Sequence, residues 1–229
     1  MKILAIETSC DETSVAIVEA KGGLKNPSFK ILSNTVLSQI KIHAHWGGVV
    51  PMMAKREHQK NLIPILKKSL VKAKLLKNSK AEYLNPKQIQ NSKFKIINKI
   101  LNREPELMEQ FLKFIPMIET PKIDAIAVTV GPGLEPALWV GVNFAKALAT
   151  IWNKPIVGVN HMEGHITAVL LNGGNSKFEI RNSRQIQFPA IALLVSGGHT
   201  ELVLIKKWGD YKIIGKTRDD AAGEAFDKT

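Results

Sequence analysis

Short apolar runs separated by polar turns open the chain and predict three consecutive β-strands. Short runs rich in Ile and Val and bounded by turn residues are typical of strands. They are residues 2–7 (KILAIE), 14–18 (SVAIV) and 29–36 (FKILSNTV). A Gly-Gly-Val-Val-Pro loop follows, and helical spacing from Ala54 to about Lys77 then predicts a helix.

The second half of the chain alternates strand-like and helix-like segments. Buried strands are predicted at 124–130 (DAIAVTV) and 155–159 (PIVGV), and helices at about 135–151 and 161–171. Further strands are predicted at 190–195, 201–205 and 211–215.

Residues from about 76 to 120 differ in amino-acid composition from the rest of the chain and are interpreted as a surface insertion. Lys and Asn are frequent, Asn85-Pro86 is a turn signal, and 106–114 (ELMEQFLKF) is amphipathic. Such a composition favours a solvated, partly helical excursion. The polar stretch 173–187 is interpreted as a linker.

The predicted order of strand, turn, strand and strand that begins at residue 2 occurs again from residue 190, which indicates an internal duplication. Two related α/β lobes, each opening with a β-hairpin, are the architecture of the actin/Hsp70/sugar-kinase superfamily, and we expect that duplicated-lobe fold. The first lobe is expected at 1–187 and the second, incomplete, at 188–229, because a hairpin, a third strand and the start of a helix cannot bury a core. A fold analogy implies no reaction by itself.

Charge and cysteine content bear on partners and compartment. The 32 Lys and Arg against 20 Asp and Glu give a net charge of +12. That balance favours a polyanionic partner, and ordinary solvated Lys-rich faces are the alternative. One cysteine, Cys10, allows no internal disulfide. No apolar run approaches the roughly 20 residues of a membrane span, so a cytoplasmic protein without a membrane partner is expected.

Two polar turns are candidate ligand sites, at 8–13 (TSCDET) and 196–200 (SGGHT). In the first, Asp11 and Glu12 can orient a metal, a water or an amine. In the second, paired glycines let consecutive N–H groups converge on an anion. Ordinary hairpin turns have the same composition. The duplication favours the ligand interpretation, because turns that open two related lobes would face each other across a cleft.

His161 and His165 are a candidate metal pair. Four residues apart on a helix, they share one face and can reach one ion. The pattern is not that of the zincins, because Glu does not follow the first His, so a metallopeptidase has no support. Two imidazoles do not complete a metal site, and a further ligand is required.

The terminal run 219–228 (DDAAGEAFDK) predicts a capped amphipathic helix. Asp219 or Asp220 is the expected N-cap. Glu224 and Asp227, three residues apart, are expected on one face.

Six motifs stand in a fixed order along the chain. They are IETSCDET (6–13), His43 with GGVVP (47–51), GPGL (131–134), NHMEGH (160–165), LVSGGHT (194–200) and DDAAGEAFDK (219–228). Together they resemble the bacterial and archaeal tRNA threonylcarbamoyladenosine transferases, and the resemblance covers the chain apart from the Lys/Asn-rich insertion.

The resemblance implies a metal-dependent acyl transfer from threonylcarbamoyl-AMP to N6 of the adenosine 3′ of the anticodon in ANN-decoding tRNAs. It makes His161 and His165 ligands of a divalent metal, Fe²⁺ or Zn²⁺, and the cleft a candidate site for ATP or ADP. It places Asp11 and Glu12 near the chemistry as candidate catalytic residues. Substrate contacts are implied for Leu194, Val195, Ser196, Gly197, Gly198 and Asp227.

The implied partners are tRNA and, in bacteria, a paralogous metal-free subunit with a small ATPase, or, in archaea, a kinase-containing assembly. Two departures stand out. Met52 replaces an acid of the family's Pro-Glu-Leu-Ala segment, and the family continues past Thr229 to a third metal ligand, an Asp. We therefore expect the 229-residue chain alone to be inactive and poorly stable. The alternatives are a non-catalytic partner subunit, which the retained histidines disfavour, and a nucleotide-dependent kinase of the same superfold, which does not explain the histidine pair.

Overall fold

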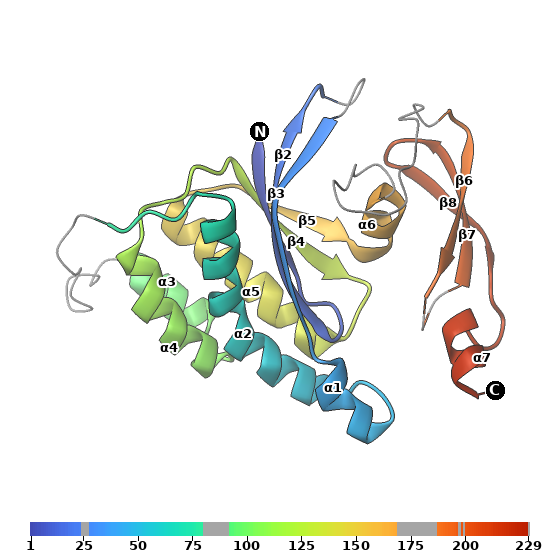
Figure 1. Ribbon diagram of the computed structural model, residues 1–229, viewed down its shortest axis with the longest axis horizontal. Coiled ribbons are helices and arrows are strands. Elements are labelled where there is room, and N and C mark those ends of the chain that lie inside the picture. Colours follow the sequence, from blue (N-terminus) through green and yellow to red (C-terminus); the bar gives the residue numbers. More distant parts are fainter. Residues whose placement is uncertain (24–27, 80–91, 169–186, 197, 199, 229) are drawn as a thin grey trace. The chain divides into compact units, whose positions relative to one another are not determined.

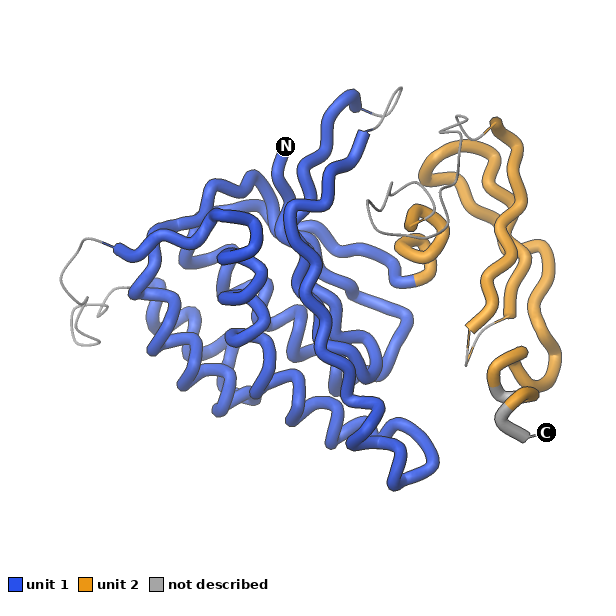
Figure 2. The backbone as a smooth tube through the Cα atoms, viewed as in Figure 1, with its two compact units in different colours: residues 1–161 blue, residues 162–229 orange. Residues whose placement is uncertain are grey.

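The computed structural model describes residues 1–23, 28–79, 92–168, 187–196, 198 and 200–228. These form two compact units, residues 1–161 and 162–229 (Figure 2). The division falls before the predicted lobe boundary at 187/188, because Ile166 is buried in a cluster with Leu194, Val203 and Ile205 of the second unit. The predicted linker lies almost wholly outside the described residues, so the lobe boundary itself stays a prediction.

A five-stranded sheet forms the centre of unit 1, in the order β3-β2-β1-β4-β5 (Figure 1). The strands are β1 (Lys2–Glu7), β2 (Glu12–Lys21), β3 (Ser28–Ser38), β4 (Ala125–Gly131) and β5 (Ile156–Asn160). The first three form an antiparallel meander, and β1, β4 and β5 run parallel. All five predicted strands of this region are confirmed. The carboxyl ends of the three parallel strands therefore meet at one edge of the sheet.

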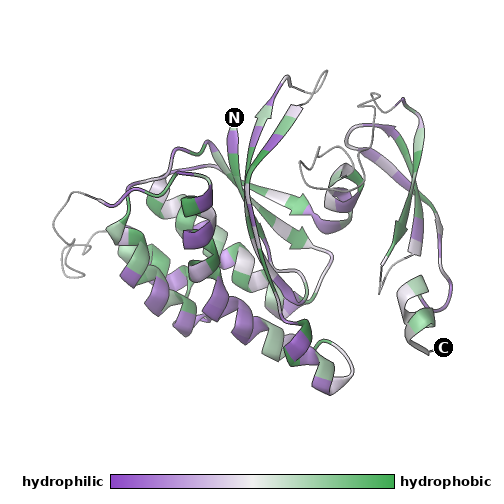
Figure 3. Ribbon diagram, viewed as in Figure 1, coloured by the Kyte–Doolittle hydropathy of each residue, from purple (hydrophilic) through white to green (hydrophobic). Residues whose placement is uncertain are grey.

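Helices make up most of the remainder of unit 1. They are α1 (Ile40–His43), η1 (Ala44–Trp46), α2 (Pro51–Lys72), α3 (Ser92–Ile100), α4 (Pro105–Phe114), η2 (Ile115–Met117) and α5 (Glu135–Trp152). Helices α2 and α5 pack on the strands, α4 packs against α2, and α3 packs against α5. Figure 3 shows hydrophobic and hydrophilic residues along α2 and α4, as expected for helices with one buried face.

The interpretation of residues 76–120 as a solvated surface segment is wrong for α3 and α4, which contribute buried side chains to the core; that the segment is an insertion stays a prediction. Ile97, Leu101 and Phe111 are at most 1% exposed. The ring of Phe111 meets that of Phe144 in α5 edge-on, with centroids 6.2 Å apart. The amphipathic spacing of α4 thus buries its apolar face against α2 and α5. Residues 80–91 of the predicted insertion lie outside the described part.

Two neighbouring residues of α3 test this placement. Ile97 is 1% exposed and Ile96 is 47% exposed. Replacing Ile97 with valine is expected to lower the free energy of unfolding by ~1 kcal/mol, because a buried methylene is lost. Ile96→Val removes the same group from an exposed site and is the matched control, with an expected change within ~0.5 kcal/mol. Urea titrations measure both, and equal effects would contradict the buried position of α3.

The burial of the two later parallel strands differs. Strand β4 is largely buried, as predicted. The prediction that β5 is buried is wrong, since Ile156 and Val157 are 41% and 51% exposed. Strand β5 is at the edge of the sheet, so it has a neighbouring strand on one side only. Its apolar sequence did not distinguish a covered from an uncovered strand.

Unit 2 repeats the antiparallel three-stranded meander that opens unit 1. It holds an antiparallel sheet of β6 (Ala190–Val195), β7 (Thr200–Lys207) and β8 (Asp210–Lys216), most of α6 (His161–Ala168), and α7 (Ala222–Lys228). All three predicted strands are confirmed. Ile191, Leu193 and Val195, at alternate positions of β6, are exposed. One face of this strand therefore carries apolar side chains without cover.

The predicted α/β class with two meander-opened lobes of the actin/Hsp70/sugar-kinase type is confirmed. Each unit opens its sheet with an antiparallel meander, and unit 1 continues into parallel strands joined by a helix. No helix within the described ranges is long and apolar enough to span a membrane.

Candidate functional site

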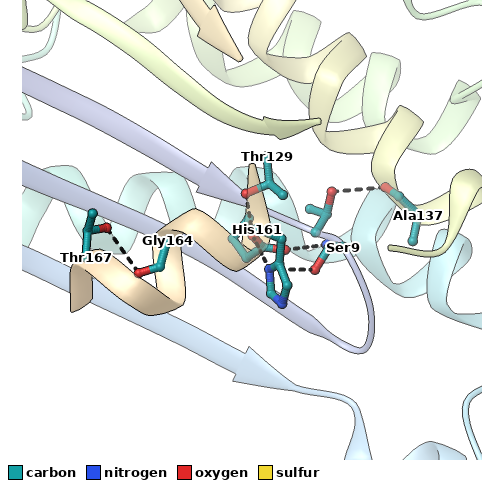
Figure 4. Close-up of polar contacts among 8 residues, drawn as sticks. Ser9, Thr129, Ala137, His161, Gly164 and Thr167 are labelled. Atoms are coloured by element: carbon teal, nitrogen blue, oxygen red, sulfur yellow. Dashed lines mark hydrogen bonds and ion pairs between the residues drawn. The ribbon is translucent and has the colours of Figure 1, made fainter. Parts of the chain in front are cut away.

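Glu7 organises a polar cluster where the parallel strands end. It is the last residue of β1, Thr129 lies near the end of β4, and His161 follows β5 directly. The Thr129 hydroxyl donates to Oε2 of Glu7, and the backbone N–H of Ser9 donates to Oε1 at 2.5 Å. Nδ1 of His161 lies 3.4 Å from Oε2 of Glu7 and 3.3 Å from Oγ of Ser9 (Figure 4). Strand order thus brings together residues that are distant in sequence.

The Glu7 carboxylate is held in its ionised form. Burial alone would raise the pKa of Glu7, but hydrogen bonds from Ser9 and Thr129, together with the charge on His161, outweigh it, so this pKa lies below its ordinary value. An ionised acceptor at Nδ1 favours the His161 tautomer that carries its proton there. In the neutral form of the ring, this tautomer has its lone pair on Nε2.

This arrangement fits a metal-binding histidine. Metal-ligating imidazoles commonly donate their second N–H to a carboxylate, which fixes the ring and raises the basicity of the ligating nitrogen. His165 lies one turn further along α6, so the helix presents both rings on one face. Among the described residues, no three His, Cys, Asp or Glu side chains form a complete metal site. Glu7 was not among the residues predicted from sequence, and the third ligand stays a prediction.

The turn that follows β1 is fixed by the start of α5. The Thr8 hydroxyl donates to the carbonyl oxygen of Ala137 at 3.0 Å, and the N–H of Leu134 donates to that of Ser9 at 2.7 Å. Gly133 and Gly141 make this approach possible. A Cβ atom at Gly133 would lie 2.6 Å from the Ser9 oxygen, and one at Gly141 would lie 2.3 Å from Oγ1 of Thr8. The Gly-Pro-Gly motif therefore supports the acidic turn.

A buried histidine of α2 holds the same turn from the other side. His58 is fully buried, and its Nε2–H donates to the carbonyl oxygen of Cys10 at 3.0 Å. Its Nδ1 accepts from the Thr13 hydroxyl at 2.8 Å and from the Gln39 amide at 3.3 Å. Burial lowers the pKa of His58, which keeps the ring neutral. Each nitrogen of His58 therefore has a defined role, donor at Nε2 and acceptor at Nδ1.

The chain of hydrogen bonds continues to the GGVVP loop. Oε1 of Gln39 accepts from Nε2 of His43 at 3.0 Å, and Nδ1 of His43 accepts from the N–H of Val50 at 3.3 Å. The backbone N–H of Gln39 donates to the carbonyl oxygen of Asp11 at 2.9 Å. Gln39 and His43 are both buried. The path links the acidic turn, α2 and the loop, and sequence reasoning missed His58 and Gln39.

The predicted catalytic carboxylates sit at the end of this turn. Asp11 is half-buried, and Glu12 is exposed at the first position of β2. Desolvation of the thiol and the charge of Asp11 raise the pKa of Cys10 to about 11, so the thiol stays protonated at neutral pH. Cys10 is therefore a poor nucleophile, whereas the catalytic roles of Asp11 and Glu12 stay predictions.

In unit 2 the structure brings the SGGHT turn and the terminal helix together. The N–H of Gly223 donates to the carbonyl oxygen of Ser196 at 3.3 Å, and that of Ala222 donates to the Thr200 hydroxyl at 2.9 Å. Asp227 therefore lies on a helix whose start is bonded to this turn. Leu194 is buried and Val195 exposed at the end of β6, Gly198 is exposed, and Gly197 lies outside the described residues.

The prediction that Asp219 or Asp220 caps the terminal helix is wrong. Helix α7 begins at Ala222, and the hydroxyl of Thr200, from the start of β7, accepts from its first N–H. A side chain distant in sequence thus takes the role that local preference gave to the aspartates. The proposed pairing of Glu224 and Asp227 on one face concerns side chains outside the described set.

Comparisons with known proteins decide the family. The sequence profile of the tRNA N6-adenosine threonylcarbamoyltransferases matches residues 30–80 and 102–229. The chain belongs to this family. It is 42% identical over 228 residues to the tRNA N6-adenosine threonylcarbamoyltransferase of Dictyoglomus turgidum, and 40% identical over 227 residues to that of Anaeromyxobacter dehalogenans. These alignments cover 100% and 99% of this chain and 50% of each relative.

Two further facts qualify the likeness to this family. The chain spans about half the length of the curated threonylcarbamoyltransferases it matches. The profile leaves residues 1–29 and 81–101 unmatched, and the second of these segments includes α3. Among solved structures, YeaZ from Pseudomonas aeruginosa is similar with a TM-score of 0.41 and 13% identity, over 94% of this chain and 66% of that chain.

Proposed function

We propose that this chain supplies the metal-binding lobe and part of the donor site of a tRNA threonylcarbamoyltransferase. The contact between Glu7 and His161 at the strand edge is the observation that supports this proposal, because it suits a ligating imidazole. In the proposal, His161 and His165 hold Fe²⁺ or Zn²⁺. A metal held by these two imidazoles would supply Lewis-acid polarisation of the carbamoyl carbonyl.

The proposed reaction forms one bond and breaks another. N6 of the adenosine attacks the carbamoyl carbon of threonylcarbamoyl-AMP, the bond from this carbon to the phosphate oxygen breaks, and AMP leaves. Asp11 or Glu12 accepts the proton that N6 loses. Ser196, Gly198 and their neighbours Leu194, Val195 and Gly197 hold the donor with Asp227, and ATP or ADP can occupy the same cleft. The bonds that join Ser196 and Thr200 to α7 support one common donor site.

The proposed partners follow from this role. The substrate is an ANN-decoding tRNA, modified at the adenosine 3′ of the anticodon in the cytoplasm. The assembly is a paralogous metal-free subunit with a small ATPase, or a kinase-containing complex. The family match and the net charge of +12 support tRNA as the polyanion.

Product analysis tests this function. The protein encoded by the continuous reading frame that contains this chain is incubated with its partner subunits, threonylcarbamoyl-AMP, tRNA and Zn²⁺ or Fe²⁺. Nucleoside mass spectrometry is expected to detect threonylcarbamoyladenosine, with none from the His161→Ala/His165→Ala variant and none from the 229-residue chain alone. Product that is independent of metal or of the histidine pair would overturn the proposal.

A further inference from the structure

A cavity of about 550 Å³ opens among α2, α3 and α5 in unit 1, next to the start of α4. Four cationic residues line it. They are Lys55, Lys99, Arg103 and Lys146. The indole of Trp139 also lines the cavity, whereas Glu7, Asp11 and His161 do not. A volume of this size accommodates a ligand as large as one nucleotide.

The lining has a net positive charge. Its two carboxylates are Glu104 and Glu135. Glu104 is buried, and Nδ2 of Asn143 donates to its Oε2 at 3.2 Å. Burial raises the pKa of Glu104, and the hydrogen bond from Asn143 opposes this effect. The four cationic side chains therefore outnumber the two carboxylates of the lining.

Three helix starts add to this field. Met52 lies in the first turn of α2 and Lys55 follows this turn directly, Glu135 and Pro136 lie in the first turn of α5, and Glu104 is the N-cap residue of α4. None of these three helices has a side-chain hydrogen bond at its N-cap. The partial positive charge of each helix start thus reinforces the lysines and Arg103 in attracting an anion.

Trp139 gives the cavity a flat aromatic face. The residue is 47% exposed, and Nζ of Lys146 lies 5.4 Å from its ring centroid. Exposed aromatic rings beside cationic groups are the elements that bind single-stranded nucleic acids, since bases stack on the ring while cations meet the phosphates. A free inorganic anion would use the cations and leave the indole without a role.

Part of this lining comes from residues that the family profile leaves unmatched. Lys99 and Ile100, at the end of α3, fall in the unmatched segment 81–101, whereas Trp139 and Lys146 fall in the matched part. The segment therefore adds a cation to one wall of a cavity whose other wall is α5. This combination distinguishes the cavity from the sites implied by the family motifs.

We propose that this cavity binds a single-stranded segment of RNA, with one base stacked on Trp139 and the adjoining phosphates held by Lys99 and Arg103. The inference goes beyond the proposed function, because it requires neither the metal nor the threonylcarbamoyl donor. A free nucleotide presents the same base and phosphate, but it lacks the successive phosphates that several cations along one cavity can meet together.

The test measures binding of a fluorescein-labelled hexaribonucleotide to the 229-residue chain by anisotropy, at several salt concentrations. Lys99→Gln/Arg103→Gln is expected to weaken binding ~10-fold or more and to lower the salt slope by about 1.4, since each lost phosphate contact removes ~0.7. Trp139→Ala is expected to weaken binding ~5-fold or more through lost stacking. Thermal unfolding of each variant confirms that it is folded.

Two controls sharpen the result. Lys21→Gln/Lys113→Gln removes the same charge from exposed side chains outside the cavity and is expected to change affinity less than ~2-fold. AMP and inorganic phosphate are expected to bind more weakly than the oligonucleotide. Equal losses in the two double variants, or tighter binding of AMP than of RNA, would overturn the inference. The His161→Ala/His165→Ala variant is expected to bind RNA normally, which separates this site from the proposed catalytic one.

Discussion

Replacing His161 and His165 together with alanine is expected to lower the affinity of the chain for Zn²⁺ ~100-fold or more. The two imidazoles lie one turn apart on α6, and the first is oriented by the Glu7 carboxylate. Nitrogen ligands provide the direct bonds to a metal of this type, so their loss removes the site itself. Isothermal titration calorimetry at pH 7.5 with Zn²⁺, and under anaerobic conditions with Fe²⁺, measures the affinity.

The control and the Glu7 variant distinguish a specific site from general histidine binding. His45→Ala removes an exposed imidazole elsewhere in unit 1 and is expected to leave the affinity unchanged. Glu7→Gln keeps the shape of the side chain but removes the charge that orients His161, so a loss of ~10-fold or more is expected. Equal affinities for the unchanged chain and the double-histidine variant would show that α6 does not bind the metal.

Glu7 illustrates why part of the site could not be predicted from sequence. The apolar run of β1 predicts a strand that ends at this residue, and the motif around it was recognised. Its role depends on β4 and β5 lying beside β1 in that order, which places Thr129 and His161 at the same edge. Strand order is a non-local property that local alternation of apolar and polar residues does not encode.

The segment containing α3 and α4 shows the same limit for packing. The amphipathic spacing noted at 106–114 agrees with helix α4, but an apolar helical face can meet either a core or a partner. The decision rests on Phe144 of α5 and on Leu62 and Leu66 of α2, which bury Phe111 and Leu107 in one cluster. Exposed lysines on these helices, among them Lys93, Lys95 and Lys113, gave the composition its surface-like character.

The burial of His58 could be predicted from the sequence, whereas its hydrogen-bond partners could not. Its spacing of four from Ala54 and from Leu62 places it on the buried face of α2, and this pattern could have identified it as a core histidine. Its partners could not be identified in the same way, because Cys10, Thr13 and Gln39 come from the turn, β2 and the residue before α1. The same network aligns the turn that carries Asp11.

Replacing His58 with alanine is expected to lower the free energy of unfolding by ~4 kcal/mol or more. The imidazole bonds three polar groups, the buried Thr13 hydroxyl and Gln39 amide and the part-buried Cys10 carbonyl. Each group left without a partner costs ~1–3 kcal/mol, and the emptied volume adds to the loss. Urea titrations at pH 7.5 measure this change, and His45→Ala, at an exposed position, is the matched control.

The His58 network also predicts a pH dependence of stability. Burial places the pKa of His58 below its ordinary value of ~6.5, so below that pH the unfolded chain binds the proton more readily than the folded one. The stability from the neutral ring is therefore fully present above pH ~6.5 and is lost as pH falls through the folded-state pKa, at up to ~1.4 kcal/mol per pH unit. His58→Gln cannot take up this proton, so its difference in free energy of unfolding from the unchanged chain is expected to shrink between pH 7 and pH 5. A difference in free energy of unfolding that stays constant from pH 7 to pH 5 would contradict the assignment of His58 as a neutral, buried ring that stabilises the turn.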